Sequence, residues 1–269
     1  MKLLILAGSQ PRHRYVVKRL ALLNVETKVV IMNRESMLPT PPDETSMRDR
    51  RLFERHFELR EASEARHFGS ADTGVWIQEV ADLVVEPTQL NGAETARFIA
   101  AFHPDVCLVF GTDLIKEPVF GNLPDLTFNI HLGLSPWYRG SATLFWPFYF
   151  MEPQCAGATI HRLVQAVDYG DVAYQSTPSL QVGMGIHDVG SSTVVSLCSK
   201  LEAMLDLISH GRKLVFAQQR SSGRIFRVRD FRAAHLRVNY EIFEDRMVDA
   251  WLAGDLGGHE PSLVQLSHE

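Results

Sequence analysis

The sequence has few cysteines, no long apolar run and no excess of charge of one sign. Its three cysteines (Cys107, Cys155 and Cys198) lack the spacing of a metal site, and an odd number cannot all pair in disulfides. We therefore expect a reduced, cytoplasmic protein. No apolar segment reaches the roughly 20 residues that a membrane-spanning helix needs. The formal net charge of −5 gives no basic footprint for nucleic acid.

The first thirty or so residues contain neither a signal peptide nor a dinucleotide-binding fingerprint, although they look like both at first sight. Residues 2–7 are apolar like the centre of a signal peptide, but no cleavage site follows, so we expect a first β-strand. A helix over about 11–23 and a strand over 25–32 complete a Rossmann-like opening, with Ser9 as the helix cap. The intervening Gly8-Ser-Gln-Pro-Arg-His-Arg is not the GxGxxG fingerprint of dinucleotide-binding proteins.

This first loop carries a basic cluster with two interpretations. Ser9, Arg12 and His13 lie at the start of the expected helix, where backbone N–H groups favour anions. They either bind a phosphate of a substrate or form a solvated basic turn. Neither alternative is excluded by the sequence.

Periodicity along the rest of the chain predicts an α/β fold. Apolar runs predict strands over 83–86, 105–112, 126–130, 157–164 and 172–175, and the 105–112 run is typical of a strand buried on both faces. Helices are expected over 44–68, from Asn91 to 103, and from Asp188 or the serines at 191–192 to 210. We expect a Rossmann-like, mostly parallel twisted sheet with flanking helices in residues 1–211, with a helical insertion near 44–68. Residues 212–269 form a small C-terminal extension, and 226–243 are apolar enough to suggest a homodimer surface.

Two polar side chains stand at the exit of the expected 126–130 strand. Asn129 and His131 are two residues apart, so in a strand they point to the same side. Ligands of parallel α/β sheets bind outside the carboxyl ends of the strands. An amide that donates to an oxyanion and an imidazole that passes a proton suit chemistry on a carbonyl group.

Three ordered motifs resemble the folate-dependent formyltransferases, a family that includes the glycinamide ribonucleotide, methionyl-tRNA and sugar N-formyltransferases. They are Asn-Ile-His-Leu-Gly-Leu-Ser-Pro-x-Tyr-Arg-Gly at 129–140, Gly-Ala-Thr-Ile-His at 157–161 and Val-Asp-x-Gly-Asp at 167–171. The likeness extends over about 2–215 in layout and is specific at 105–175.

The resemblance implies a site and a co-substrate. Asn129, His131 and Asp168 match the family's catalytic residues, and the formyl donor would be 10-formyltetrahydrofolate, with no metal. By this resemblance Asp168 raises the pKa of His131, and the protonated imidazole and Asn129 hold the oxyanion. The folate would lie between two segments, which contribute Thr112, Asp113, Leu114 and Ile115, and Leu163, Val164 and Gln165. Arg139 either braces its loop or contacts substrate, and His161 is expected to be structural.

The acceptor is expected to be a small amine. The last sixty or so residues show no basic run of the kind that would hold tRNA, and the first loop differs from the Gly/Ser/Asn-rich phosphate loop of the purine enzyme. The 132–143 segment looks most like that of enzymes acting on small amines and amino sugars, so a nucleotide-linked amino sugar is the first hypothesis. Hydrolysis of formyltetrahydrofolate, a methionyl-tRNA formyltransferase-like activity and a non-catalytic folate-binding module are the alternatives.

Overall fold

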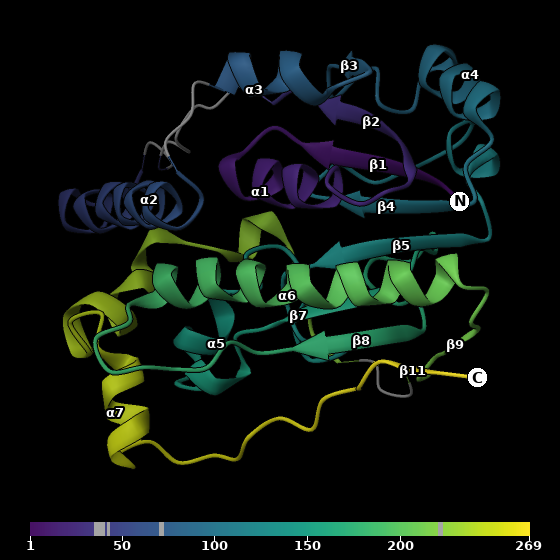
Figure 1. The fold of residues 1–269 in the computed structure, drawn as a ribbon. Helices are drawn as coiled ribbons and strands as arrows, with labels where there is room; N and C mark the ends of the chain where they lie inside the picture. The colour runs from purple at the N-terminus through teal and green to yellow at the C-terminus, as the bar shows by residue number, and fades with distance from the viewer. Residues whose placement is uncertain (35–40, 42–43, 70–72, 220–222) are drawn as a thin grey trace.

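A central sheet with helices on both faces organises the computed structural model (Figure 1). The structure describes residues 1–34, 41, 44–69, 73–219 and 223–269, without the side chains of residues 73 and 74. The sheet has seven strands in the order β3-β2-β1-β4-β5-β7-β8. Their bounds are β1 (Lys2–Gly8), β2 (Glu26–Met32), β3 (Leu83–Val85), β4 (Val106–Phe110), β5 (Leu126–His131), β7 (Ala158–Arg162) and β8 (Val172–Ser176).

The strand directions confirm the expected, mostly parallel sheet. β3, β2, β1, β4 and β5 pair in parallel, and β7 is antiparallel to both β5 and β8. Apolar side chains fill both faces of the central strands, as continuous apolar runs predict. On β1, Leu3 and Ile5 belong to one buried cluster and Leu4 and Leu6 to another.

The helices cover the sheet in two layers. They are α1 (Pro11–Leu20), α2 (Met47–Phe68), α3 (Thr73–Val80), α4 (Ala93–Phe102), the short α5 (Trp146–Tyr149), α6 (Ile186–Ser209) and α7 (Met247–Ala253). α1, α3 and α6 pack on one face, and α4 packs on the other. Among the described residues, no helix has the length and apolar character needed to cross a membrane.

Two expected helix caps, Ser9 and Asn91, and one expected helix start were wrong. α1 is capped at Gln10, because the Ser9 hydroxyl is bonded to the backbone N–H and carbonyl of Arg34 at 3.1 and 3.0 Å. α4 starts after Gly92, since the Asn91 side chain bridges the backbone of Leu114 and Lys116. α6 starts at Ile186, earlier than expected, so Asp188 lies inside its first turn.

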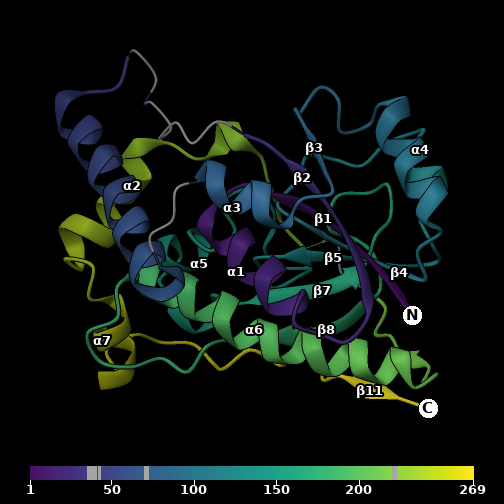
Figure 2. The same cartoon turned by 45° about the horizontal axis from the view of Figure 1, so that its top comes forward.

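The chain after residue 212 returns to the sheet and to α2. A short strand, β10 (Ile225–Phe226), pairs with β6 (Arg139–Gly140), and β11 (Ser267–His268) pairs with β9 (Leu214–Val215). Between these pairs lie a π-helical turn (Val238–Ile242) and α7. The aromatic and aliphatic side chains of this segment share one core with α2 and α5. Figure 2 shows α2 beside α1, α6 and this C-terminal segment.

Candidate functional site

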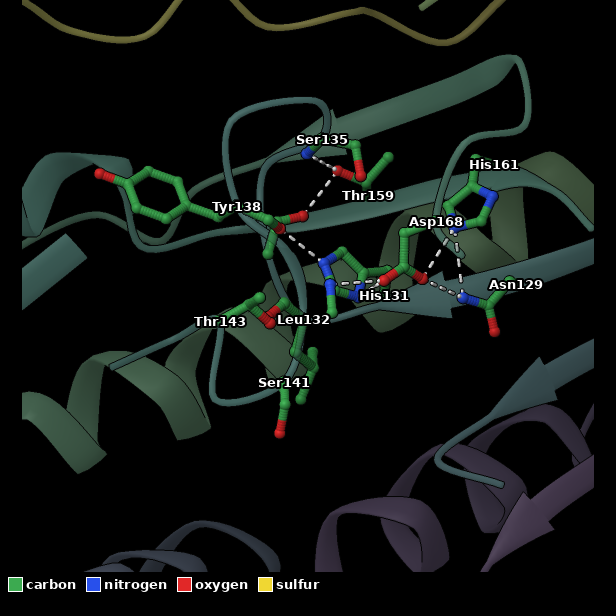
Figure 3. Close-up of polar contacts among 12 residues, drawn as sticks. Asn129, His131, Leu132, Ser135, Tyr138, Ser141, Thr143, Thr159, His161 and Asp168 are labelled. Carbon is green, nitrogen blue, oxygen red and sulfur yellow. Dashed lines mark hydrogen bonds and ion pairs between the residues drawn. The ribbon is translucent and has the colours of Figure 1, made fainter. Parts of the chain in front are cut away.

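The exit of β5 carries the two polar residues that the sequence singled out. Asn129 is half-buried and His131 is buried, and both side chains lie on the same side of β5 (Figure 3). His131 Nε2 lies 2.7 Å from the carbonyl oxygen of Tyr138. Because that carbonyl only accepts, Nε2 carries the hydrogen, which leaves Nδ1 as the basic nitrogen of the neutral ring.

Asp168 joins this pair from the turn between β7 and β8. Its Oδ2 lies 3.4 Å from His131 Nδ1 and accepts a hydrogen bond from the Gly140 amide at 2.8 Å. The residue has a left-handed backbone conformation, with φ of 48°, and Gln219 Nε2 donates to its carbonyl at 3.0 Å. The structure therefore brings together the three side chains to which the resemblance assigns catalysis.

A fourth polar residue, His161, completes the cluster. Its Nδ1 donates to the carbonyl of Arg162 at 2.8 Å, so its Nε2 accepts from Asn129 Nδ2 at 3.2 Å. The Nδ2 of Asn129 also donates to Asp168 Oδ1 at 3.2 Å. Both amide hydrogens of Asn129 are thus engaged inside the cluster, and its oxygen points away from it (Figure 3).

His161 was expected to be structural, and its contact with the site was missed. β5 and β7 are antiparallel, and their register sets His161 opposite Asn129. A register between strands that are 32 residues apart cannot be read from periodicity in either strand alone. The useful signal was the position of His161 in the strand that leads to Asp168.

Burial and mutual contacts set the pKa values of His131 and Asp168. Burial lowers the pKa of His131, and although Asp168 and the Tyr138 carbonyl raise it, the net shift is downward. Burial raises the pKa of Asp168, but His131, His161 and the Gly140 amide outweigh it and lower the value to about 2. The expected raising influence of Asp168 on the pKa of His131 is thus present, but burial outweighs it in the free protein.

Buried hydrogen bonds fix the loop that follows β5. Thr159 Oγ1 accepts from the amide of Ser135 at 3.0 Å and donates to the carbonyl of Gly133 at 2.7 Å. Gln175 Nε2 donates to the Ser135 carbonyl at 2.6 Å. A Cβ at Gly133 would lie 2.5 Å from His131 Nε2, so only glycine allows the loop to pass this close to the ring.

The two segments expected to hold folate each contribute to one apolar cluster. Ile115 is buried in this cluster, and Leu163 packs against it partly buried. Beside them, Leu114 and Val164 expose 54% and 39% of their surface, an apolar area open to a ligand.

The polar members of these segments have mixed environments. Thr112 is half-buried, with its hydroxyl bonded to the Asp113 carbonyl at 3.0 Å, and the Asp113 carboxylate pairs with Arg34. Gln165 is exposed. Among the described residues, the Gln165 side chain has no hydrogen-bond partner within the protein.

The basic first loop does not form the expected anion site around His13. The ring of His13 is 4% exposed and fills the crevice between the ends of β1 and β4, where a Cβ at Gly8 or Gly111 would lie within 2.6 Å of a ring nitrogen. Burial, Arg12 and Arg34 lower its pKa well below the usual value. A buried neutral ring does not suit an anion, so its expected substrate role was wrong.

The other expected substrate residues are also held by the protein. Ser9 is buried against Arg34, and Arg12 forms an ion pair with Glu64 at 2.6 Å. Arg139 is buried, with its guanidinium 5.1 Å from the ring centre of Tyr169. This position fits the bracing role of Arg139 better than a substrate contact.

Known proteins resemble this chain in sequence family and in fold. A family model described as formyl transferase matches residues 44–190, more than half of the chain. A sugar N-formyltransferase from a Shewanella species aligns with a TM-score of 0.54 at 14% identity, over 86% of this chain and 78% of the other. Glycinamide ribonucleotide transformylase 1 from Symbiobacterium toebii gives 0.54 at 17%, over 81% and 92%.

A third solved structure contains bound ligands. It is an N-formyltransferase from Helicobacter canadensis in complex with folinic acid and dTDP-3-aminofucose, with a TM-score of 0.52 at 15% identity, over 86% of this chain and 72% of the other. At these identities the structures show a shared fold. The family match lies over all three motifs at 129–171 and confirms the resemblance that they suggested. The chain belongs to the formyl transferase family.

Proposed function

We propose that this protein transfers a formyl group from 10-formyltetrahydrofolate to a primary amine of a small acceptor, with a nucleotide-linked amino sugar as the acceptor class. The observation that carries the proposal is the convergence of Asn129, His131 and Asp168 at the carboxyl end of β5. The likeness to the Helicobacter canadensis enzyme, whose structure holds folinic acid and an amino-sugar nucleotide, supports both substrate classes. The free cysteines and the absence of a membrane-spanning helix among the described residues are compatible with a cytoplasmic location.

In the proposed reaction the acceptor amine attacks the formyl carbon, and a new C–N bond forms. The carbonyl oxygen becomes an oxyanion until the bond from the formyl carbon to N10 of the folate breaks. One proton must leave the amine, and one must reach N10. Neutral His131 takes the first proton at Nδ1, directly or through a water molecule, and later releases it to N10.

Asp168 stabilises the charge that appears on His131 during this transfer. Its carboxylate faces Nδ1 at 3.4 Å and is ionised at neutral pH because its pKa is about 2. The carboxylate does not need to accept the proton itself. It lowers the free energy of the imidazolium, which burial alone would disfavour.

Asn129 supplies the donor for the oxyanion in this scheme. Both of its N–H groups are donated inside the cluster, to Asp168 and to His161. One of these contacts must therefore be exchanged for the oxyanion as the formyl group binds. Removing one oxyanion donor from an enzyme costs about 3–4 kcal/mol of transition-state stabilisation.

The folate is proposed to lie between the 112–115 segment and residues 163–165. Exposed apolar side chains at Leu114 and Val164 would cover the flat pterin, while backbone groups read its edge. Thr112, Asp113, Ile115, Leu163 and Gln165 complete the two segments. Substituting Leu114 by Asp is expected to raise the KM for the folate without a matching loss of kcat.

Mass spectrometry of an amine and sugar-nucleotide panel incubated with 10-formyltetrahydrofolate tests the proposal. One acceptor is expected to gain a single formyl group, and Asn129→Ala is expected to lose this activity. The matched control Asp171→Asn removes an exposed carboxylate three residues from Asp168 and is expected to keep it. Release of formate at the same rate without any acceptor would instead indicate a hydrolase. Full transfer activity in Asn129→Ala would overturn the assigned mechanism.

A further inference from the structure

The segment that follows α6 meets the turn between β7 and β8 through a backbone bridge. Ala217 and Val172, the first residue of β8, exchange both of their backbone hydrogen bonds at 2.8 Å in an antiparallel bridge. In an antiparallel pair, a step forward on one chain is a step back on the other. The bridge therefore brings Gln219, two residues after Ala217, to Gly170, two residues before Val172.

The side-chain amide of Gln219 holds this turn at two points. Its Nε2 donates to the carbonyl oxygen of Asp168 at 3.0 Å and to that of Gly170 at 2.7 Å. Both carbonyls only accept, so the N–H end of the amide faces them and both of its hydrogens are used. The residue is 6% exposed, so water competes little for these two contacts.

The other end of the same amide shows that Gln219 does more than fill space. Among the described residues, its Oε1 is buried without a hydrogen-bond partner. A buried acceptor without a partner is destabilising, and a methionine of similar volume would avoid it. The two N–H groups therefore explain why an amide occupies this position.

The turn depends on external contacts because its backbone is unfavourable. Asp168 has a φ of 48°, a left-handed conformation that residues with a side chain rarely adopt. A Cβ at Gly170 would lie 1.8 Å from the carbonyl oxygen of Arg162, so only glycine fits there. Such backbone conformations persist only where surrounding groups hold them. The hydrogen bonds from Gln219 supply this support on both sides of residue 169.

The same C-terminal segment also acts on the carboxylate of Asp168. β10 pairs with β6 and so fixes Gly140, whose amide donates to Asp168 Oδ2 at 2.8 Å. The side chain of Asp168 is therefore held through β10, and its backbone is held by Gln219. With these two contacts the carboxylate faces His131 Nδ1 at 3.4 Å.

We infer that Gln219 is a positioning residue for formyl transfer, because its amide holds the Asp168 turn so that the carboxylate faces His131 Nδ1. This inference rests on the proposed function and extends the catalytic unit beyond residue 190, where the family match ends. Among the described residues, the hydrogen bonds of Gln219 reach neither of the segments proposed to hold folate. Its loss should therefore slow the transfer step without weakening the binding of the substrates.

Kinetics of Gln219→Met test this role, since methionine keeps the volume of the side chain and removes both donors. We expect kcat to fall by about 10- to 100-fold, the effect of displacing a catalytic group by up to about 1 Å, with the KM for both substrates near the wild-type value. The matched control Gln218→Met changes the exposed neighbouring glutamine and should keep full activity.

NMR of the His131 ring tests the position of the carboxylate without formyl transfer. Asp168 raises the pKa of His131, so a displaced carboxylate should move the titration of the ring to lower pH, toward that of Asp168→Asn. His161 and Arg139 also act on this pKa, and both are unchanged in Gln219→Met. An unchanged titration with an unchanged kcat would overturn the inference. A lower melting temperature alongside them would show that Gln219 is only structural.

The same two measurements separate this inference from the proposed function. If the wild-type protein transferred no formyl group to any acceptor but Gln219→Met still moved the His131 titration, the proposed function would be refuted and the positioning of Asp168 supported. If the wild-type protein and Gln219→Met transferred the formyl group at the same rate, the inference would be refuted and the proposed function would stand.

Discussion

Replacing Asp168 by Asn removes one charge from the cluster with little change in shape. The Asp168 carboxylate lies 3.4 Å from His131 Nδ1, with its side chain 10% exposed. At an effective dielectric constant of about 20, an opposite charge at this distance stabilises an imidazolium by about 5 kcal/mol. Desolvation and the remaining hydrogen bonds reduce the net effect, so we expect kcat to fall by roughly a thousandfold.

Two measurements on Asp168→Asn follow this effect separately. The rate of formyl transfer reports the loss of catalysis, with Asp171→Asn as the control. Proton NMR of the His131 ring reports its titration, which is expected to move to lower pH in the variant because the raising influence of Asp168 is gone. Retention of more than about a tenth of the wild-type kcat, or an unchanged His131 titration, would refute the reasoning.

The same variant also has a predicted stability. Binding partners lower the pKa of Asp168 from 3.8 to about 2, so the folded state favours its ionised form. This stabilisation is present above pH 3.8, amounts to about 2 kcal/mol, and is lost as the pH falls through about 2. Urea unfolding between about pH 2 and 4 should show this loss in the wild-type protein and not in Asp168→Asn. An unchanged unfolding free energy would contradict the assigned contacts.

Three further predictions concern stability and are checked by urea unfolding. Burial lowers the pKa of His187 to about 3, so the unfolded chain binds the proton first as the pH falls. The contribution of His187 to the unfolding free energy is therefore complete above pH 6.5 and is lost between pH 6.5 and about 3. The same dependence of unfolding free energy on pH in a His187→Gln variant would contradict this. Thr159→Val removes the acceptor for the Ser135 amide and should cost about 2 kcal/mol, whereas Thr159→Ser should cost much less. Gly111→Ala places a Cβ 2.1 Å from His13 Nε2, at a residue with a φ of 72°, and should lower the unfolding free energy by more than about 2 kcal/mol. The double variant with His13→Ala removes the clash but not the backbone strain, so it should not regain full stability.

The sheet could be predicted because its strands are buried on both faces. Val106 to Phe110 and Leu3 to Ala7 are continuous apolar runs, and each forms a central strand. The spacing of Asn129 and His131 also fixed their common direction, since period two is a property of a single strand. These inferences needed only local sequence.

Features that depend on tertiary contacts were not predictable in the same way. His161 meets Asn129 through the register of β5 and β7, and His13 turns inward because two glycines leave room for its ring. The charge of His131 depends on the balance between burial and a carboxylate 37 residues away, and burial dominates.

Transfer of a labelled formyl group tests the central claim most directly. The protein is incubated with 10-formyltetrahydrofolate carrying carbon-13 in the formyl group and with a nucleotide-linked amino sugar, and the label is followed by NMR. We predict that the label appears as an amide on the sugar nitrogen, in equal amount to the tetrahydrofolate formed, and that Asp168→Asn slows both together. Label that appears only as free formate, at a rate independent of the sugar and of Asp168, would contradict the account.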